Sequence, residues 1–268
     1  MKGKTVIITG ASSGIGKACA LFFASRGSNV VITGRNEANL SDTLKEIQKT
    51  GAKAIAVKAD VSILSDAQKI IDETLREFNG IDVLINNAGI SMRGLFADTN
   101  LDVLHQLMNT NFWGTVYCTH FALPHILKNK GSVVGISSIA GKKGLPGRTG
   151  YSASKFAMEG FLETLRTENL KKDLHVLVAC PGFTASAIRN AALGPDGKPQ
   201  SESPRDEQKM MSAETVAEHI YKAVVNRKRD LVLTSNGKLT IFLNKFIPGW
   251  LDKLVYDHMA KEPGSPFK

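Results

Sequence analysis

The sequence has little of what disulfide-stabilised or metal-binding proteins need. Only three cysteines occur, Cys19, Cys118 and Cys180, and they are widely separated in apolar or helical surroundings. This spacing excludes a disulfide framework and predicts buried free thiols in a reducing compartment. The six histidines form neither an H-E-x-x-H motif nor a cluster with the cysteines, so we expect no metal site.

Long apolar runs are also missing. No stretch of about 18 uninterrupted apolar residues occurs, so no membrane-spanning helix is expected. The apolar run near the N-terminus ends at Gly10, which is too early for a signal peptide. These absences together lead us to expect a cytoplasmic protein.

The charge balance is basic, with a formal net charge of +9. The basic residues are spread along the chain, and no basic helix with interleaved aromatic residues occurs. We therefore favour a soluble enzyme with a solvated basic surface and expect no nucleic-acid partner. Attraction to an anionic cofactor or to an anionic membrane surface is the alternative that this charge leaves open.

Short apolar, β-branched runs alternate along the chain with longer stretches of helical periodicity. Gly27, Gly51 and Gly80 stand where the first helices are expected to end. Strands that are apolar on both faces and alternate with helices indicate a parallel sheet covered on both sides. We expect one α/β domain over residues 1–268, a doubly wound, Rossmann-type three-layer sandwich with a seven-stranded parallel sheet and helices on both faces. The expected strands are 5–9, 30–33, 54–57, 83–85, 133–136, 176–179 and 231–233.

A glycine-rich turn, TGASSGIG at 9–16, joins the first expected strand to the first helix. Its spacing, G-x-x-x-G-x-G, differs from the G-x-G-x-x-G dinucleotide fingerprint, but the physics is shared. Missing side chains let the backbone approach a pyrophosphate, and the helix N-terminus offers N–H groups and a positive dipole end. A turn that needs glycine only for its geometry is the alternative. The cofactor contacts expected here are Gly10, Ser12, Ser13, Gly14, Ile15 and Gly16.

The end of the second strand indicates which nicotinamide cofactor is used. NAD sites carry an acidic residue there for the ribose 2′-hydroxyl, whereas this chain has Gly34 followed by Arg35. An arginine can hold a 2′-phosphate with two hydrogen bonds, so NADP(H) is favoured over NAD(H), unless Arg35 is merely a solvated residue at a helix start. Further contacts are expected after the third and fourth strands, from Asp60, Val61, Asn87, Ala88 and Gly89, although the asparagine could serve only the turn.

The segment YSASK places Tyr151 and Lys155 four residues apart, and therefore on one face of a helix. A phenol has a pKa of about 10, and a cation within about 4–6 Å can lower it toward the range needed for proton transfer. The pair alone occurs often by chance. Ser138, at the end of the fifth strand, could hold a carbonyl oxygen beside the phenol. Asn111 could anchor a water in a proton relay or could simply pack a helix.

These motifs together resemble the short-chain dehydrogenase/reductase family, over about residues 4–235. The matching pieces are TGASSGIG, NNAG, ISSIAG, YSASK and CPG, in the family's order and spacing. The resemblance implies Tyr151 as general acid/base and Lys155 as the residue that contacts the nicotinamide ribose and lowers the tyrosine pKa. It also implies that Ser138 orients the substrate and that Asn111 takes part in a proton relay. Hydride would pass between nicotinamide and a carbonyl or alcohol carbon.

The chain departs from the family after Pro181 and Gly182. The family often has a threonine five residues beyond this proline, close to the carboxamide of the cofactor, but here the position is Ser186 and a threonine, Thr184, stands two residues earlier. The hydroxyl is kept while the residue type is not. All four residues are expected to contact the cofactor.

Residues 183–211 form a long polar segment that is expected to cover the substrate, unless it is a disordered loop. Its apolar residues would make the covered side hydrophobic; these are Phe183, Ile188, Leu193, Met210 and Met211.

The C-terminal extension, 237–268, resembles that of the lipid- and steroid-acting branch of the family, which includes 11β-hydroxysteroid dehydrogenases. Its apolar residues alternate with Lys238, Lys245 and Lys253. Such an amphipathic segment could pack on a partner subunit or on its own sheet, which we favour, or could make a peripheral membrane contact through 237–259.

The sequence therefore predicts an NADP(H)-dependent oxidoreductase that acts on a ketone or a secondary alcohol, with a hydrophobic, steroid- or lipid-like substrate. A 3-ketoacyl reductase and a sugar or polyol dehydrogenase are alternatives of the same class. A non-catalytic NADP(H)-binding sensor is the alternative from another class. A homodimer or homotetramer is expected, because dimerisation through the helices that carry Asn111 and Tyr151 is common in the family.

Overall fold

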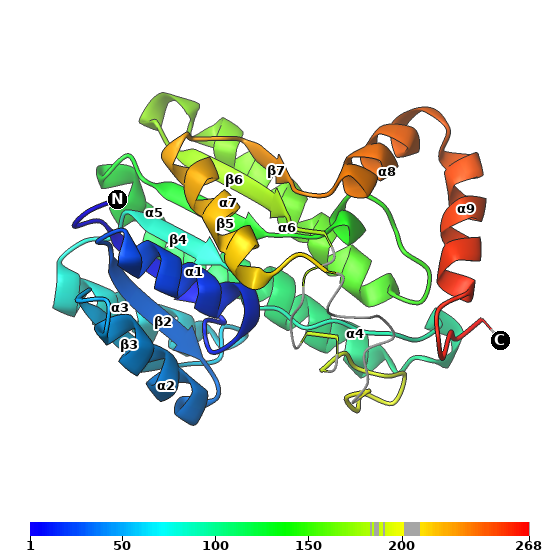
Figure 1. The fold of residues 1–268 in the computed structure, drawn as a ribbon, viewed down its shortest axis with the longest axis horizontal. Helices are drawn as coiled ribbons and strands as arrows, with labels where there is room; N and C mark the ends of the chain where they lie inside the picture. The colour runs from blue at the N-terminus through cyan, green and yellow to red at the C-terminus, as the bar shows by residue number, and fades with distance from the viewer. Residues whose placement is uncertain (183, 185–187, 190, 201–209, 268) are drawn as a thin grey trace.

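A parallel sheet forms the centre of the molecule (Figure 1), and the computed structural model describes residues 1–182, 184, 188–189, 191–200 and 210–267. Within these residues the sheet has seven strands in the order β3-β2-β1-β4-β5-β6-β7, all pairs being parallel. The chain order reverses direction between β1 and β4, which opens a crevice at the carboxyl ends of these strands. The strands are β1 Thr5–Thr9, β2 Asn29–Gly34, β3 Ala54–Lys58, β4 Val83–Asn86, β5 Ser132–Ile136, β6 His175–Cys180 and β7 Asp230–Val232.

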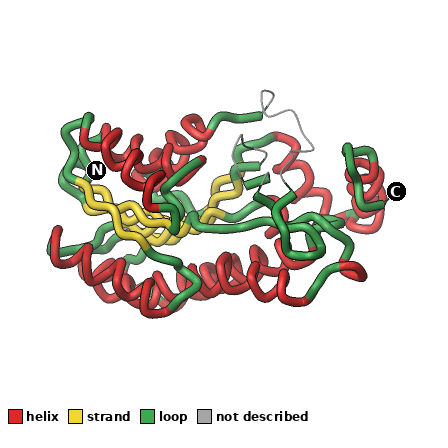
Figure 2. Tube along the Cα trace, turned by 90° about the horizontal axis from the view of Figure 1, so that it is seen from below, coloured by secondary structure: helices red, strands yellow, loops and turns green. Residues whose placement is uncertain are grey.

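Helices cover both faces of the sheet (Figure 2). Alternate residues of β1 point to opposite faces: Val6 and Ile8 pack with α1, α2 and α7, whereas Ile7 packs with α3, α5 and α6. Each fully buried aliphatic side chain of this kind contributes about 1.5–3 kcal/mol to folding. The helices are α1 Gly14–Ser25, α2 Glu37–Gln48, α3 Leu64–Phe78, α4 Leu101–Leu107, α5 Gly114–Lys128, α6 Thr149–Glu168, α7 Ala213–Val225, α8 Ser235–Phe246 and α9 Pro248–Ala260.

This architecture confirms the predicted fold class, a doubly wound α/β sandwich. Each predicted strand agrees with the observed strand to within one residue at either end. Gly27 and Gly51 have the positive φ angles, 79° and 78°, expected just after a helix. At the third helix the prediction was wrong, because Asn79 and not Gly80 takes the left-handed conformation, with a φ of 56°. Asparagine tolerates this region because its short polar side chain bonds locally.

The C-terminal extension forms helices α8 and α9, which leave the sheet after β7 and then turn back (Figure 1). Asn244 donates a hydrogen bond of 3.2 Å to the Lys142 carbonyl, and Lys143 forms an ion pair with Asp252. The tail beyond α9 returns to the loop after β4, where Arg93 donates a hydrogen bond of 2.8 Å to the Pro263 carbonyl and lies 3.6 Å from the Glu262 carboxylate. In the described part of the chain, no helix combines the length and the apolar character needed to cross a bilayer.

Candidate active site

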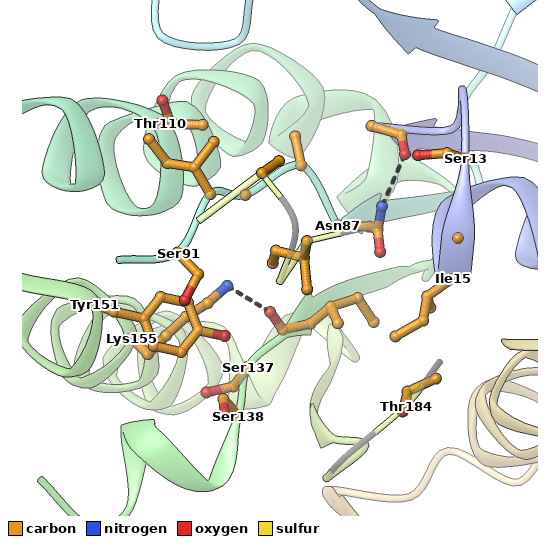
Figure 3. A pocket seen from close by; sticks show the side chains of 18 of the residues that line it. Ser13, Ile15, Asn87, Ser91, Thr110, Ser137, Ser138, Tyr151, Lys155 and Thr184 are labelled. Atoms are coloured by element: carbon orange, nitrogen blue, oxygen red, sulfur yellow. Dashed lines mark hydrogen bonds between the residues drawn. The ribbon is translucent and has the colours of Figure 1, made fainter. Parts of the chain in front are cut away.

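One cavity lies at the carboxyl ends of the strands and brings together most of the predicted site residues (Figure 3). Gly16 and Asn111 do not line it, and Ser186 lies outside the described residues. The predicted residues that line the cavity are Gly10, Ser12, Ser13, Gly14, Ile15, Arg35, Asp60, Val61, Asn87, Ala88, Gly89, Ser138, Tyr151, Lys155, Pro181, Gly182 and Thr184.

The glycine turn is held against the loop after β4 by side chains that fix its shape. Asn87 Nδ2 donates to the carbonyls of Thr9 and Gly10 at 2.9 and 3.1 Å, and Thr9 Oγ1 accepts from the backbone N–H groups of Asn87 and Ala88, both at 3.0 Å. A Cβ at Gly10 would lie 2.8 Å from the Ala88 Cα, so only glycine permits this approach. Our sequence reasoning missed the anchoring role of Thr9, although the residue stands within the quoted motif.

The start of α1 suits a phosphate group. Its N-cap, Ser13, makes no side-chain cap hydrogen bond, and Ser13, Gly14 and Ile15 all line the cavity. The first N–H groups of a helix carry the positive end of its dipole and bind anions. Gly16 acts by packing instead, because a Cβ there would collide with the Gly10 carbonyl and the Asn87 amide. The turn therefore fits the pyrophosphate of a dinucleotide.

The opposite end of the cavity carries the two charged residues expected near the adenosine. Arg35 Nη1 lies 3.8 Å from Asp60 Oδ2, and the Arg35 side chain is 67% exposed. Asp60 is fixed by the backbone N–H and hydroxyl of Ser62, which donate to its Oδ1 at 3.0 and 2.7 Å. The arginine is thus held only loosely by its neighbour and can reach a ligand phosphate.

Thr184 offers a second test of the fit to a nicotinamide cofactor. Its hydroxyl is buried at the cavity wall and has no hydrogen-bond partner among the described residues. A buried hydroxyl without a partner is costly unless a ligand completes it. The residues present therefore fit a nicotinamide dinucleotide.

Asn111 lies in a short π-helical segment, Met108–Trp113, between α4 and α5, rather than in a regular helix. Its Oδ1 accepts from the Ile90 N–H at 2.8 Å, and its Nδ2 donates to the Ile90 carbonyl and to Ser154 Oγ at 3.0 and 2.9 Å. Both amide protons are therefore in use, and the side chain ties the loop after β4 to α6. A Cβ at Gly89 would lie 3.0 Å from Asn111 Oδ1 and 3.5 Å from Lys155 Nζ, so the amide and the ammonium flank the same glycine.

Tyr151, Lys155 and Ser138 meet at the inner end of the cavity (Figure 3). Burial raises the pKa of the Tyr151 phenol, while the Ser138 hydroxyl and the positive charges of Arg148 and Arg189 oppose this rise. Burial also lowers the pKa of Lys155 to about 8.

The structure differs from expectation at the lysine. The Lys155 ammonium donates to the Ile136 carbonyl at 2.8 Å and lies 5.8 Å from the centre of the Tyr151 ring. Its hydrogen bond is thus made to the end of β5 and not to the phenol.

The substrate side of the cavity contains residues that our sequence reasoning missed. Arg148 is 9% exposed and donates to Ser91 Oγ and the Met92 carbonyl at 3.2 and 3.4 Å. Arg189 is 8% exposed and donates to the Thr184 carbonyl at 2.6 Å. Arg148 stands three residues before the tyrosine but is the non-helical N-cap of α6, so helical spacing does not place it. Arg189 belongs to a loop, for which no periodicity applies.

The predicted covering segment, 183–211, is only partly described, and Phe183 lies outside the described residues. Leu193 pairs with Met92 through backbone hydrogen bonds to Ser91 and Arg93 of 2.9 and 2.8 Å, and it packs in a small apolar cluster that Tyr151 borders. Ile188 lines the cavity, in agreement with its expected position. Met211 instead packs against the core between α1 and α7, because its residue bridges to Thr184 beside the sheet.

Comparison with known proteins gives consistent matches. Residues 4–194 match the short chain dehydrogenase family. The protein named 11-beta-hydroxysteroid dehydrogenase-like 4A from Arabidopsis thaliana is 41% identical over 229 residues, which cover 84% of this chain and 73% of that protein. Dehydrogenase/reductase SDR family member 7B from Bos taurus is 35% identical over 270 residues, covering 98% of this chain and 83% of that protein.

Solved structures share the fold. A short chain dehydrogenase/reductase from Burkholderia phymatum, determined in complex with NAD, superposes with a TM-score of 0.84 at 24% identity, over 93% of this chain and 95% of that one. A putative short-chain alcohol dehydrogenase from Sinorhizobium meliloti 1021 gives a TM-score of 0.67 at 28% identity, over 70% and 75% of the two chains. The first likeness concerns the fold alone.

Proposed function

Because this chain belongs to the short-chain dehydrogenase/reductase family of oxidoreductases, we propose that it is an NADP(H)-dependent enzyme acting on a ketone or a secondary alcohol. The observation that carries this proposal is the convergence of Tyr151, Ser138 and Lys155 at the inner end of one cavity whose other end fits a dinucleotide. A bound nicotinamide would supply or accept the hydride. The protein would position the substrate and handle the proton.

The roles of the side chains follow from their environment. A phenol whose pKa is raised by burial is protonated near neutral pH, so Tyr151 is suited to donate a proton to a carbonyl oxygen during reduction. Ser138, which lowers the pKa of the phenol and lines the cavity beside it, would hold the same oxygen. Lys155 would leave the Ile136 carbonyl to contact the cofactor ribose, where its charge favours phenolate when the reaction runs toward oxidation. A water molecule of the proton relay would donate a hydrogen bond to the remaining lone pair of Asn111 Oδ1, beside Gly89.

We propose NADP(H) rather than NAD(H) as the cofactor because Arg35 borders the cavity and no acidic residue stands at Gly34. Asp60 would lie near the adenine, and Ser186 would keep a hydroxyl close to the carboxamide. Gly16 would support the site by letting α1 approach the turn. The direct contacts proposed are the cavity-lining residues named above, from Gly10 to Thr184.

A hydrophobic substrate is supported by the apolar residues on the substrate side, which include Ile90, Leu145, Ile188 and Ala191. The name of the Arabidopsis relative, 11-beta-hydroxysteroid dehydrogenase-like 4A, is in keeping with this class. A 3-ketoacyl thioester joined to a carrier that bears anionic phosphate is the second candidate. Arg148 and Arg189 favour it, because both are buried in the wall of the cavity and their charges reach the phenol.

Assembly and location are part of the proposal. Trp113 and Phe156 are 42% and 46% exposed next to the segments that carry Asn111 and Tyr151, which supports a homodimer or homotetramer formed through these helices. The second exposed apolar surface, on α8 and α9, supports either subunit packing or peripheral membrane contact of a cytoplasmic protein. It consists of Leu239, Phe242, Phe246, Ile247, Trp250 and Leu254.

The proposal is tested by following NADPH consumption with a panel of carbonyl compounds, from acetoacetyl esters and thioesters through small sugars and diketones to steroids. Turnover of bulky apolar ketones that is lost in Tyr151→Phe is expected. Preferred turnover of acetoacetyl thioesters would support the second candidate. Tight NADPH binding without turnover of any panel member would contradict the catalytic proposal and support an NADP(H)-binding sensor.

A further inference from the structure

A buried carboxylate, Glu159, lies beside the proposed catalytic residues but has no part in the chemistry described above. It stands on α6 four residues after Lys155 and eight after Tyr151, on the same face of the helix. The residue is 8% exposed. Since burying a carboxylate is costly unless it is paired and hydrogen-bonded, its partners indicate what it stabilises.

The partners of Glu159 come from both sides of Ser138. The Ser137 hydroxyl donates a short hydrogen bond to Glu159 Oε1, and Lys142 Nζ lies 2.6 Å from Oε2. Ser137 directly precedes Ser138, and Lys142 follows the 3₁₀ turn Ile139–Gly141 that Ser138 caps. The carboxylate therefore holds both ends of the segment that carries Ser138.

Two successive turns of α6 hold successive residues at the end of β5. Lys155 donates to the Ile136 carbonyl at 2.8 Å, and Glu159 accepts from the next residue, Ser137. The fit is close, since a Cβ on Gly141 would collide with both Glu159 Oε1 and Ser137 Oγ. This packing leaves the turn little freedom to shift relative to the helix that carries the phenol.

The charge of Glu159 also affects the pKa of Lys155. Burial lowers the Lys155 pKa, while negative charge at Cys180 or Glu159 would raise it. Because burial raises the pKa of the Cys180 thiol to about 12, this thiol is neutral near neutral pH, which leaves Glu159 as the relevant anion. Burial raises the pKa of Glu159 as well, but Lys142 and Ser137 oppose that rise and favour the charged carboxylate. Asp230, on β7, raises the pKa of Lys142.

We propose that Glu159 is a positioning residue of the active site, which fixes the turn carrying Ser138 and places a negative charge one helical turn from the Lys155 ammonium. The inference rests on the proposed oxidoreductase function. It predicts that Glu159 affects catalysis through Ser138 and Lys155, whereas a merely structural carboxylate would affect only the free energy of unfolding.

The test compares Glu159→Gln, which keeps the size and hydrogen-bonding capacity but removes the charge, with Glu163→Gln. Glu163 lies one turn further along α6, is 64% exposed and pairs with Arg229 at 2.9 Å, so it is a control for loss of a helix carboxylate. We expect Glu159→Gln to lower kcat/KM about tenfold or more, since small displacements of catalytic groups cost this much, and Glu163→Gln to leave it unchanged. We also expect the alkaline limb of the pH profile to move to lower pH in Glu159→Gln.

Two further measurements separate the possible outcomes. In a Ser138→Ala background, Glu159→Gln should cost less than in the wild type, because the two residues act together. The pH dependence of NADPH affinity, followed by fluorescence, should shift to lower pH in Glu159→Gln even if no substrate is turned over. This readout distinguishes failure of the inference from failure of the proposed function.

If Glu159→Gln fails to fold, Lys142→Met tests the same charge from its 31% exposed partner and should shift the NADPH pH dependence in the opposite direction, to higher pH, because the carboxylate then loses its neighbouring cation. A lowered melting temperature with unchanged kcat/KM, pH profile and NADPH affinity would overturn the inference.

Discussion

Lys155 donates a hydrogen bond of 2.8 Å to the carbonyl of Ile136, the last residue of β5, so the lysine of the YSASK segment supports the strand that leads to Ser138. The same ammonium is almost completely buried, at 4% exposure. Burying this ammonium is costly, because desolvation disfavours its charged form.

The stability of the protein should depend on pH through Lys155. Its pKa is about 8 in the folded protein and 10.5 ordinarily, so between these values the unfolded chain binds more protons. The contribution of Lys155 to the free energy of unfolding should therefore rise with pH across this window, by an amount on the order of 3 kcal/mol. We expect the difference in urea unfolding between wild type and Lys155→Met to change by this amount between pH 8 and 10.5. A constant difference would show that the buried amine does not titrate there.

Gly16 should resist substitution because α1 touches the glycine turn at this residue. Gly16→Ala places a methyl group against the Gly10 carbonyl and the Asn87 amide, and overpacking of this kind costs about 1–3 kcal/mol. The displaced turn should also weaken NADPH binding. The measurements are urea unfolding and fluorescence titration with NADPH.

Gly160 provides the matched control for that substitution. It lies within α6, and a Cβ there would meet nothing within 4 Å. Gly160→Ala should therefore stabilise the protein by about 0.5–1 kcal/mol, because alanine favours the helix. Equal effects of the two substitutions would mean that the close approach at Gly16 is unimportant.

Cofactor choice should depend on Arg35. Arg35→Ser is expected to raise the KM for NADPH about tenfold or more while changing the KM for NADH little, because a charge-assisted contact to the 2′-phosphate is lost. Arg76→Ser is a suitable control, since that exposed arginine also pairs with a neighbouring acid, Glu73, but lies outside the cavity. Tighter use of NADH than NADPH by the wild type would refute the assignment of NADP(H).

The apolar surface of α8 and α9 should govern association with membranes or other subunits. Phe242 and Phe246 are 58% and 68% exposed, and their rings lie tilted to each other with 4.9 Å between the ring centres. The double substitution to serine should lower either binding to anionic lipid vesicles in sedimentation or the oligomeric state in light scattering. Leu170→Ser, at a residue 70% exposed elsewhere, should change neither. Unaltered behaviour in both assays would leave this surface without the proposed role.

The sheet and the inner end of the site could be predicted from the sequence. The patterns of the strands and of YSASK depend only on residues that lie close together in the chain. β1 is apolar on both faces, and Tyr151 and Lys155 share a helix face by spacing alone. The π-helical segment around Asn111 could not be predicted, since its amide bonds to Ile90 and Ser154 depend on the tertiary fold. The left-handed Asn79 was missed because glycine was the stronger local candidate.

Contacts between residues far apart in the sequence could not be predicted either, because they also depend on the tertiary fold. Arg148 donates a hydrogen bond to Ser91, 57 residues away in the sequence, and Arg93 donates one to Pro263, 170 residues away. Neither pair has a spacing that a helix or strand would produce. The hydrogen bond from the Lys155 ammonium to β5 also depends on how the fold buries this side chain, which the YSASK motif does not determine.

The contacts of Arg93 have a practical consequence for handling the protein. Its backbone and side chain join the loop after β4, Leu193 and Gln200 of the covering segment, and Pro263 near the C-terminus. The two chain ends lie on opposite sides of the molecule (Figure 1). We therefore expect a tag or fusion partner attached after residue 268 to disturb the contacts of Arg93 more than one attached before Met1.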